Sequence, residues 1–267
     1  MYWEAFLVNA IAISVMMLCM WGVSLIKKDV SIVDVIWGLG FVLIAWLTWA
    51  RQPEKTLLQN ILLACVTLWG LRLAAYLAWR NWGEEEDRRY AAMREKHGDS
   101  FPLVSLLTVF ILQGIVMWVV SLPLQSGLAS SGMGVTEGIR ESVFFTAFLV
   151  WFTGLMFEAL GDYQMACFKQ NPKNQGKVFD HGLWRYTRHP NYFGDFLVWW
   201  GFGCMGFVLS AEWWSLIGPA VMSFFLMKIS GVTLLEKDLR QRKPAYAEYI
   251  KRTNAFFPGP PRTSGWD

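Results

Sequence analysis

The sequence predicts an all-α, polytopic membrane protein with seven transmembrane helices. Of its 267 residues, 54% are hydrophobic, 17% are charged and 16 are Trp. Such a composition is too apolar for an ordinary soluble domain. Seven apolar segments approach the ~20 residues that a helix needs to cross the hydrocarbon core of a bilayer. Lys and Arg are also divided unevenly between alternate connections, which indicates the orientation of these helices.

The spanning helices are expected at residues 5–26, 32–50, 57–79, 103–124, 142–162, 192–209 and 213–232. No basic residue precedes the first segment, which therefore reads as a retained helix rather than a cleaved signal peptide. Only residues 210–212 separate the last two segments, so we expect a tight helical hairpin. The charged stretch 80–100 is typical of a partly helical, solvated loop, and residues 125–141 of a plain connector. After the last helix, an amphipathic helix is expected to continue until Pro244 starts a new turn.

The charge distribution predicts an N-terminus outside the membrane and a C-terminus in the cytoplasm. Nineteen of the 24 Lys and Arg residues lie on the side of the C-terminal tail, whereas Arg51, Lys55 and Arg140 lie on the other side. Loops rich in Lys and Arg are cytoplasmic. The net charge of +3 gives no indication of a nucleic-acid partner. The four cysteines read as packing residues and the three histidines lack neighbours at ligand spacing, so no metal site is predicted.

Three polar residues fall inside predicted helices, where ionisable groups are costly and are site candidates. Asp34 lies just inside the second helix, a position where an acid also stabilises the helix N-terminus. Arg72 lies in the middle of the third helix and can pair with Asp34 or with a polar substrate group. Tyr76 follows one turn later on the same face. Its hydroxyl can donate to a carbonyl, although a lone Tyr is also typical of the membrane interface.

Glu158 and Asp162 share a face at the end of the fifth helix, where two acids repel each other and oppose the helix dipole. This placement predicts that other groups compensate the charge of the two acids. The candidates are the side chains of Arg185 or Arg188, the hydroxyls and amides of a ligand, or the side chain of Lys169 in a charge pair.

The stretch GLWRYTRHPNYFGD, residues 182–195, combines cations, an amide and an acid at the entrance to a helix. Arg185 and Arg188, with Lys169, Lys173 and Lys177 nearby in sequence, are suited to clamping phosphates, although cytoplasmic loops are basic in any case. His189 precedes a proline and is therefore extended. Asn191 then stands where it can cap a helix whose N-terminus itself attracts anions. Asp195, one turn in, suits a carboxamide or a ribose hydroxyl. We therefore predict a site for an anionic cofactor.

The string WRYTRHPNYFGD resembles the C-terminal signature of the steroid 5-alpha-reductase family, including its bacterial membrane-protein branch. The resemblance covers residues 158–258 and extends weakly to SIVDVIWGLGF and LWGLRLAAY. It implies seven helices with NADPH bound on the cytoplasmic side of the last three. By matching position, it implies these cofactor-binding residues: Glu158, Asp162, Lys169, Arg185, Tyr186, Arg188, His189, Asn191, Tyr192, Asp195 and Tyr249. The family motif more often ends in Glu, so the carboxylate of Asp195 is one methylene shorter.

Isoprenylcysteine and phospholipid methyltransferases carry a related string and use S-adenosylmethionine. The Asn191 and Asp195 ending is closer to the reductase form. We therefore expect an NADPH-dependent reductase of the carbon–carbon double bond of an apolar enone, such as a 3-oxo-Δ4 steroid. Asp34, Arg72 and Tyr76 are the candidates that polarise the substrate carbonyl. A methyltransferase of membrane lipids or prenylated cysteine is the alternative, and a transporter would show broken helices in matched halves.

The resemblance also implies how the chain is organised. Residues 1–267 are expected to form a single membrane-embedded domain, with the substrate side at 1–124 and the cofactor side at 142–260. The expected partners are an apolar small molecule that enters from the bilayer and membrane lipid. The expected location is the inner, cytoplasmic membrane of a bacterium.

Overall fold

The computed structural model describes residues 2–130, 137–229 and 245–262, and this part of the chain is helical. Within these ranges no β-strand occurs, and one isolated parallel bridge pairs Thr187 with Asn254. Six described helices are long and apolar enough to cross a membrane: Trp3–Lys27, Ile32–Ala50, Leu57–Asn81, Arg88–Val120, Gly138–Gln170 and Pro190–Ser210. The prediction of an all-α integral membrane protein is confirmed. The count of seven and the orientation stay predictions.

The chain divides into two compact units. Unit 1 comprises Met1–Glu141 and Met205–Gly218, and unit 2 comprises Ser142–Cys204 and Pro219–Asp267. Each unit is described on its own below, and a single membrane-embedded domain stays a prediction.

Unit 1 begins with α1 (Tyr2–Lys27), α2 (Ile32–Ala50) and α3 (Leu57–Asn81). The exposed positions Leu7, Ile11, Val15 and Leu18 form one apolar stripe along α1, as expected for a face that meets lipid. Helices α2 and α3 cross closely, because a Cβ atom on Gly38 would lie 2.5 Å from the carbonyl oxygen of Gly70. Small residues permit such close crossings between membrane helices.

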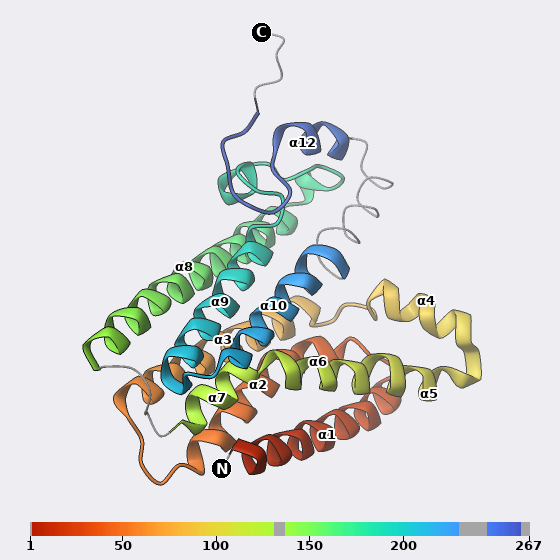
Figure 1. Ribbon diagram of the computed structural model, residues 1–267. Coiled ribbons are helices and arrows are strands. Elements are labelled where there is room, and N and C mark those ends of the chain that lie inside the picture. The colour runs from red at the N-terminus through yellow and green to blue at the C-terminus, as the bar shows by residue number, and fades with distance from the viewer. Residues whose placement is uncertain (1, 131–136, 230–244, 263–267) are drawn as a thin grey trace. The chain divides into compact units, whose positions relative to one another are not determined.

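The fourth predicted helix differs from the structure. It was expected over residues 103–124, but it is made of α5 (Phe101–Ser105), a π-helical stretch over Leu106–Ile111 and α6 (Leu112–Val120), and it stops at Val120. It is preceded by α4 (Arg88–His97) and a 3-10 turn over Gly98–Ser100. From α5 to α6 the chain forms one rod that lies beside α1 (Figure 1), where the indole N–H of Trp21 donates to Pro102 O at 3.0 Å and that of Trp118 to Phe6 O at 3.1 Å.

The prediction of a plain connector over residues 125–141 is wrong at both ends, because residues 125–129 and 137–141 are helical. A further helix, α7 (Leu122–Ala129), follows Ser121, and every one of its residues is buried. Pro123 stands in the first turn of α7, where its missing N–H costs nothing. The amide of Gln59 donates to Leu128 O at 3.1 Å and to Ser130 O at 2.8 Å. The Gly and Ser residues here therefore serve close packing.

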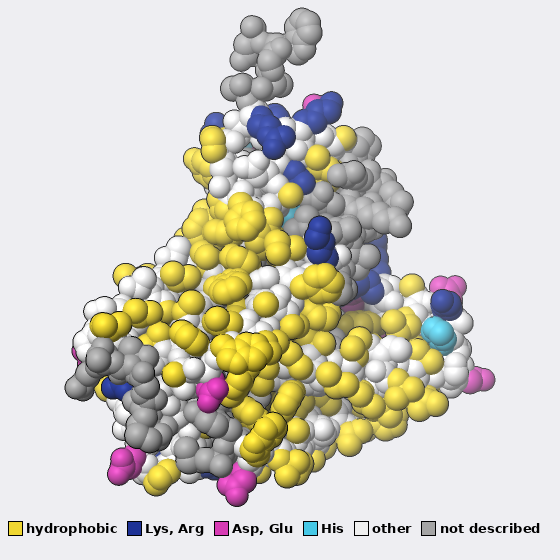
Figure 2. Space-filling view, in the orientation of Figure 1, with side chains coloured by type: hydrophobic (Ala, Val, Ile, Leu, Met, Phe, Trp, Pro, Cys, Tyr) yellow, Lys and Arg dark blue, Asp and Glu magenta, His cyan; other side chains and the backbone are white. Residues whose placement is uncertain are grey.

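Unit 2 is built on α8 (Glu137–Gln170) and α9 (Pro190–Ser210). The N-terminal residues 137–141 of α8 and the C-terminal residues 205–210 of α9 belong to unit 1. A Cβ atom on Gly194 would lie 2.4 Å from the backbone nitrogen of Glu158, so the two helices touch at main-chain distance. This crossing sets the region of α8 around Glu158 against the start of α9. Many exposed side chains of these helices are hydrophobic, whereas Lys and Arg gather around α12 (Tyr246–Arg252), as Figure 2 shows.

The chain reverses direction after α9, as predicted. Ala211 has a φ of 58°, and a 3-10 turn over Trp213–Leu216 leads into α10 (Ile217–Phe224) and a π-helical turn over Phe225–Ile229. Within unit 2, the indole N–H of Trp200 donates to the Ser223 hydroxyl at 3.0 Å, which places α9 and α10 side by side. The predicted amphipathic continuation up to Pro244, with Lys237, Arg240, Arg242 and Lys243, lies outside the described residues.

Candidate functional site

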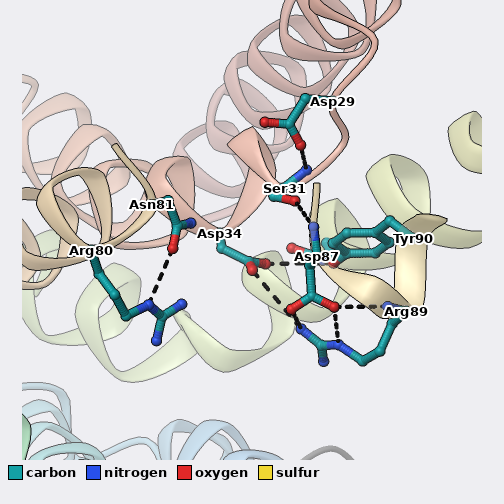
Figure 3. A network of polar contacts seen from close by, with 9 residues as sticks. Asp29, Ser31, Asp34, Arg80, Asn81, Asp87, Arg89 and Tyr90 are labelled. Carbon is teal, nitrogen blue, oxygen red and sulfur yellow. Dashed lines mark hydrogen bonds and ion pairs between the residues drawn. The ribbon is translucent and has the colours of Figure 1, made fainter. Parts of the chain in front are cut away.

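Asp34 lies in a polar cluster of unit 1 (Figure 3). It stands in the first turn of α2, and its Oδ1 accepts a hydrogen bond from the hydroxyl of Tyr90 at 3.5 Å. Its Oδ2 lies 4.0 Å from Nη2 of Arg89. The hydroxyl of Tyr90 in turn accepts from Nε2 of Gln113 at 3.4 Å. A buried tyrosine from α4 therefore stands between a carboxylate and an amide.

The charged loop before α4 is folded rather than merely solvated. Arg89 donates to both carboxylate oxygens of Asp87, at 2.9 and 3.2 Å, and the backbone N–H of Asp87 donates to the Ser31 hydroxyl at 2.8 Å. Burial raises the pKa of Asp87, but the hydrogen bonds and charge of Arg89 outweigh it and leave the pKa below its ordinary value. These contacts fix the first turn of α4, and with it Tyr90.

Glu86 fastens the same loop to the turn between α1 and α2. Its carboxylate accepts from the backbone N–H of Val30 at 2.8 Å and from Arg94 at 2.8 and 2.9 Å. Burial raises the pKa of Glu86, and the donors from Arg94 and Val30 more than reverse this, so the pKa lies below its ordinary value. The prediction that residues 80–100 form a partly helical segment is confirmed. The segment is not solvated throughout, because Tyr90 is buried and Glu86 is half-buried.

Arg72 and Tyr76 lie together on α3, as their spacing predicts. The guanidinium of Arg72 is 5.6 Å from the ring centroid of Tyr76, and that of Arg80, one turn later, is 6.0 Å from it. Cations at such distances are attracted by the face of an aromatic ring. The ion pair that the structure describes for Asp34 is the one with Arg89.

In unit 2 the start of α9 meets α8 at Glu158 and Asp162. The prediction that these two acids stand at a helix end is wrong, because α8 continues to Gln170. Glu158 and Asp162 are 4% and 6% exposed. Nδ2 of Asn191 donates to Oδ1 of Asp162 at 3.2 Å, and Oδ1 of Asn191 accepts from the backbone N–H of Tyr192 at 3.1 Å. Asn191 therefore caps its own helix and joins it to α8. Asp195, one turn further on, is half-buried.

The two residues before Asn191 start α9. Pro190 is its first residue, a position that suits the fixed φ of proline. The backbone carbonyl of His189 accepts from the N–H of Phe193 at 3.0 Å. The buried ring of His189 lies parallel to that of Tyr192, with centroids 5.5 Å apart.

The two arginines that were predicted to share one phosphate clamp differ in their surroundings. Arg185 is exposed, as are Tyr186 and Lys169, whereas Arg188 is buried. Nη1 of Arg188 donates to Ile250 O at 3.2 Å and to Thr253 O. The hydroxyl of the buried Tyr249 donates to Trp184 O. Both side chains thus join the loop before α9 to the segment that carries α12.

Sequence reasoning missed two residues of this loop. Thr187 is fully buried; its hydroxyl donates to Phe256 O at 2.8 Å and accepts from the backbone N–H of His189 at 3.2 Å. The indole N–H of Trp184 donates to Gly161 O at 3.1 Å. A threonine between two arginines gave no signal, but a Trp in so polar a string was a sign that part of the loop is buried.

This end of unit 2 carries side chains of the kinds that were predicted to contact an anion and an amide. It offers exposed cations at Lys169 and Arg185, a buried carboxylate at Asp162 and a primary amide at Asn191. Across the described ranges, no group of three or more His, Cys, Asp or Glu side chains is placed to hold a metal ion.

A family model described as "Protein of unknown function (DUF1295)" matches residues 20–253. The probable O-methyltransferase ustE of Ustilaginoidea virens is 27% identical over 138 residues, which are 52% of this chain and 43% of that protein. An uncharacterized protein of Schizosaccharomyces pombe (strain 972), C594.04c, is 25% identical in an alignment 280 positions long, which covers 90% of this chain and 75% of that protein. The chain thus spans less than half the length of the methyltransferase. No solved structure matches it significantly.

Proposed function

Because the chain belongs to the DUF1295 family, which is steroid 5-alpha-reductase-like, we propose that it is a membrane enzyme that uses NADPH to reduce a carbon–carbon double bond. The substrate class is an apolar enone, such as a 3-oxo-Δ4 steroid. The observation that carries the proposal is the hydrogen bond between Asn191 and the buried Asp162 at the start of α9, within the string that resembles the reductases and that also carries the exposed Arg185.

The residues present fit the proposed cofactor. Lys169 and Arg185 supply exposed cations for phosphate groups, and guanidinium groups bind phosphate in a bidentate manner. Asn191 and the half-buried Asp195 supply an amide and a carboxylate for the carboxamide and ribose hydroxyls. Tyr186, His189, Tyr192 and Glu158 complete the proposed set. When bound, NADPH supplies a hydride for the β-carbon of the enone.

The reaction also requires a hydrogen-bond donor for the oxygen of the enolate that forms on the substrate. A preorganised donor stabilises such developing charge. The proposed donors are Arg72, Tyr76 and a protonated Asp34, whose Oδ1 accepts the hydrogen bond from Tyr90. The hydroxyl of Tyr90 is held by Gln113 and faces Asp34. A proton delivered to the α-carbon completes the reduction.

The surroundings of the helices suit an apolar substrate. Large hydrophobic side chains are exposed along α1, α3 and α8, as lipid-facing surfaces require. We place the substrate's entry in the bilayer and the protein in a bacterial inner membrane, with the start of α9 on the cytoplasmic side, where NADPH is available.

A methyltransferase that uses S-adenosylmethionine is the second candidate. It is favoured by one observation, the 27% identity to the probable O-methyltransferase ustE over 138 residues. The acceptor would be a membrane lipid or a prenylated cysteine.

The two candidates are separated by cofactor binding. Protein purified in detergent is titrated with NADPH, NADH and S-adenosylmethionine by calorimetry, and then incubated with NADPH and a 3-oxo-Δ4 steroid. We expect saturable NADPH binding, oxidation of NADPH and a product two mass units heavier than the steroid. Saturable binding of S-adenosylmethionine without NADPH binding would sink the reductase proposal and support the methyltransferase.

A further inference from the structure

Arg188 caps the end of a helix that lies far away in sequence. It is only 7% exposed, although arginines are almost never fully buried without partners. Its Nη1 donates to Ile250 O at 3.2 Å and to Thr253 O, and its backbone N–H donates to Asn254 O at 2.9 Å. Ile250 lies in the last turn of α12 and Thr253 directly follows it. Terminal helix carbonyls lack intrahelical donors, and the helix dipole favours a cation there.

Other hydrogen bonds fasten the same two pieces of chain, which we name the arginine loop (residues 182–189) and the C-terminal segment (residues 245–262). The hydroxyl of Tyr249 donates to Trp184 O, and that of Thr187 donates to Phe256 O at 2.8 Å. The backbone N–H of Gly259 donates to Tyr186 O at 3.1 Å. Each of these bonds has at least one main-chain partner, so together they fix the path of the C-terminal segment.

The arginine loop is joined in turn to the candidate cofactor residues. The indole N–H of Trp184 donates to Gly161 O at 3.1 Å, and the backbone N–H of Leu183 donates to Oε1 of Gln164 at 3.0 Å. Gly161 directly precedes Asp162, which accepts from Asn191. A continuous set of hydrogen bonds therefore connects α12 to the end of α8.

We propose that Arg188 is a positioning residue: it holds the C-terminal segment on the arginine loop, and the segment thereby sets the shape of the cofactor site. The inference rests on the proposed function. It divides the tasks of the two arginines, with Arg185 contacting phosphate and Arg188 determining where the backbone of Arg185 lies. The hydroxyl of Thr253, next to α12, donates to that backbone carbonyl at 3.4 Å.

The experiment measures the segment and the cofactor separately. Hydrogen–deuterium exchange of the purified protein without cofactor reports on residues 245–262, and calorimetry reports on NADPH. The variants are Arg188→Met, Arg188→Lys and Tyr249→Phe. The last removes only one hydroxyl and guards against failure of the first variant to fold. Arg185→Met is the matched control, because it removes the same group from an exposed position three residues earlier.

We expect Arg188→Met to accelerate exchange in the C-terminal segment and to weaken NADPH binding, each by about tenfold, as loss of a charged hydrogen bond requires. Tyr249→Phe is expected to act in the same direction. Arg188→Lys is expected to restore part of both properties, because it keeps the charge. Arg185→Met is expected to weaken NADPH binding with unchanged exchange in the segment.

Two results would overturn the inference. Weaker NADPH binding by Arg188→Met with unchanged exchange would make Arg188 a direct ligand. Faster exchange with unchanged NADPH affinity would show that the C-terminal segment does not set the shape of the cofactor site. Failure of the wild-type protein to bind NADPH would instead contradict the proposed function, and the exchange rates would still decide whether Arg188 holds the segment.

Discussion

The hydrogen bond between Asn191 and Asp162 is the residue-scale contact on which the candidate cofactor site depends. It joins an amide in the first turn of α9 to a carboxylate that is 6% exposed on α8. A buried carboxylate is stable only while donors compensate for its lost hydration. The same amide group therefore supports the local fold, and we propose that it also contacts the cofactor.

Replacement of Asn191 by alanine is expected to reduce both properties. Asn191→Ala removes a donor from Asp162, which costs about 1–3 kcal/mol of unfolding free energy, and weakens NADPH binding by about tenfold. Thermal unfolding and calorimetry measure the two effects. Asn60→Ala is the control, since the side chain of Asn60 accepts only from the indole of Trp49 in unit 1 among the contacts described for it. Equal NADPH affinities of Asn191→Ala and wild type would exclude Asn191 from the site.

Glu86 gives a residue-scale prediction of pH dependence. Its folded-state pKa is lowered, so its stabilising contribution is fully present above the ordinary glutamate pKa of about 4.3 and is lost as the pH falls through the folded-state value. Glu86→Gln should therefore lower the unfolding free energy by about 1 kcal/mol between pH 5 and 8. The measurement is the Tm in detergent, which should fall over the same pH range. The deficit relative to wild type should shrink below about pH 4.3.

Glu85→Gln removes the same charge from an exposed neighbour and is the control for Glu86→Gln. We expect its Tm to follow that of wild type at every pH. A deficit of Glu86→Gln that stays constant down to acidic pH would show that ionisation of Glu86 is not what holds α4 to the turn at Val30.

At the scale of elements, the position of the site depends on how closely α8 and α9 approach. Glycines allow it: a Cβ on Gly154 would lie 2.6 Å from Gly194 O, and a Cβ on Gly201 would lie 2.5 Å from the Cβ of Trp151. The contact between α8 and α9 therefore extends over several turns and ends at Glu158 and Asp162. Any side chain that separates the helices also moves these acids relative to Asn191.

Gly194→Ala is the test of this crossing. The new methyl group would lie 2.4 Å from the backbone nitrogen of Glu158, which cannot move aside as a flexible side chain would. We expect a loss of about 1–3 kcal/mol in unfolding free energy, measured by thermal unfolding in detergent, and weaker NADPH binding. Gly138→Ala, where no described atom beyond its chain neighbours and the backbone of its own helix lies within 4 Å of the added group, should be neutral or slightly stabilising. Equal destabilisation by both variants would contradict the crossing.

At the scale of the whole molecule, the distribution of Lys and Arg makes the orientation testable. Cysteines are introduced singly as Glu54→Cys and Lys173→Cys, both at exposed positions, in a background without the four native cysteines. A maleimide that cannot cross the membrane should label Glu54→Cys in intact cells and Lys173→Cys only after permeabilisation. Reversed labelling would place the start of α9 outside the cell and remove it from cytoplasmic NADPH.

The apolar segments and the site residues differ in how far the sequence could predict them. Length and hydropathy were sufficient to predict that six membrane-spanning helices exist, because the hydrocarbon core of the bilayer requires about 20 mostly apolar residues in each. The Gly- and Ser-rich residues of α7 resemble a loop in composition, and only packing partners such as Gln59 reveal that they are buried.

Composition could not predict the direction in which individual side chains point. Tyr90 lies in a charged segment, and its burial follows from the turn that Asp87 and Glu86 fix. The sequence predicted that Asn191 stands at the start of a helix, which the structure confirms, but it ended the preceding helix at residue 162, whereas α8 continues to Gln170. It did not indicate that Arg188 and Arg185, three residues apart, have different surroundings.

The contacts of Arg188 also impose an order on biosynthesis. The carbonyls of Ile250 and Thr253 lie 62 and 65 residues further along the chain. At 5–20 residues per second, the ribosome adds them roughly 3–13 s after Arg188. During that interval the arginine loop exists without the groups that Arg188 finally caps. The nascent chain therefore cannot complete the contact between the arginine loop and α12 until α12 itself has been synthesised.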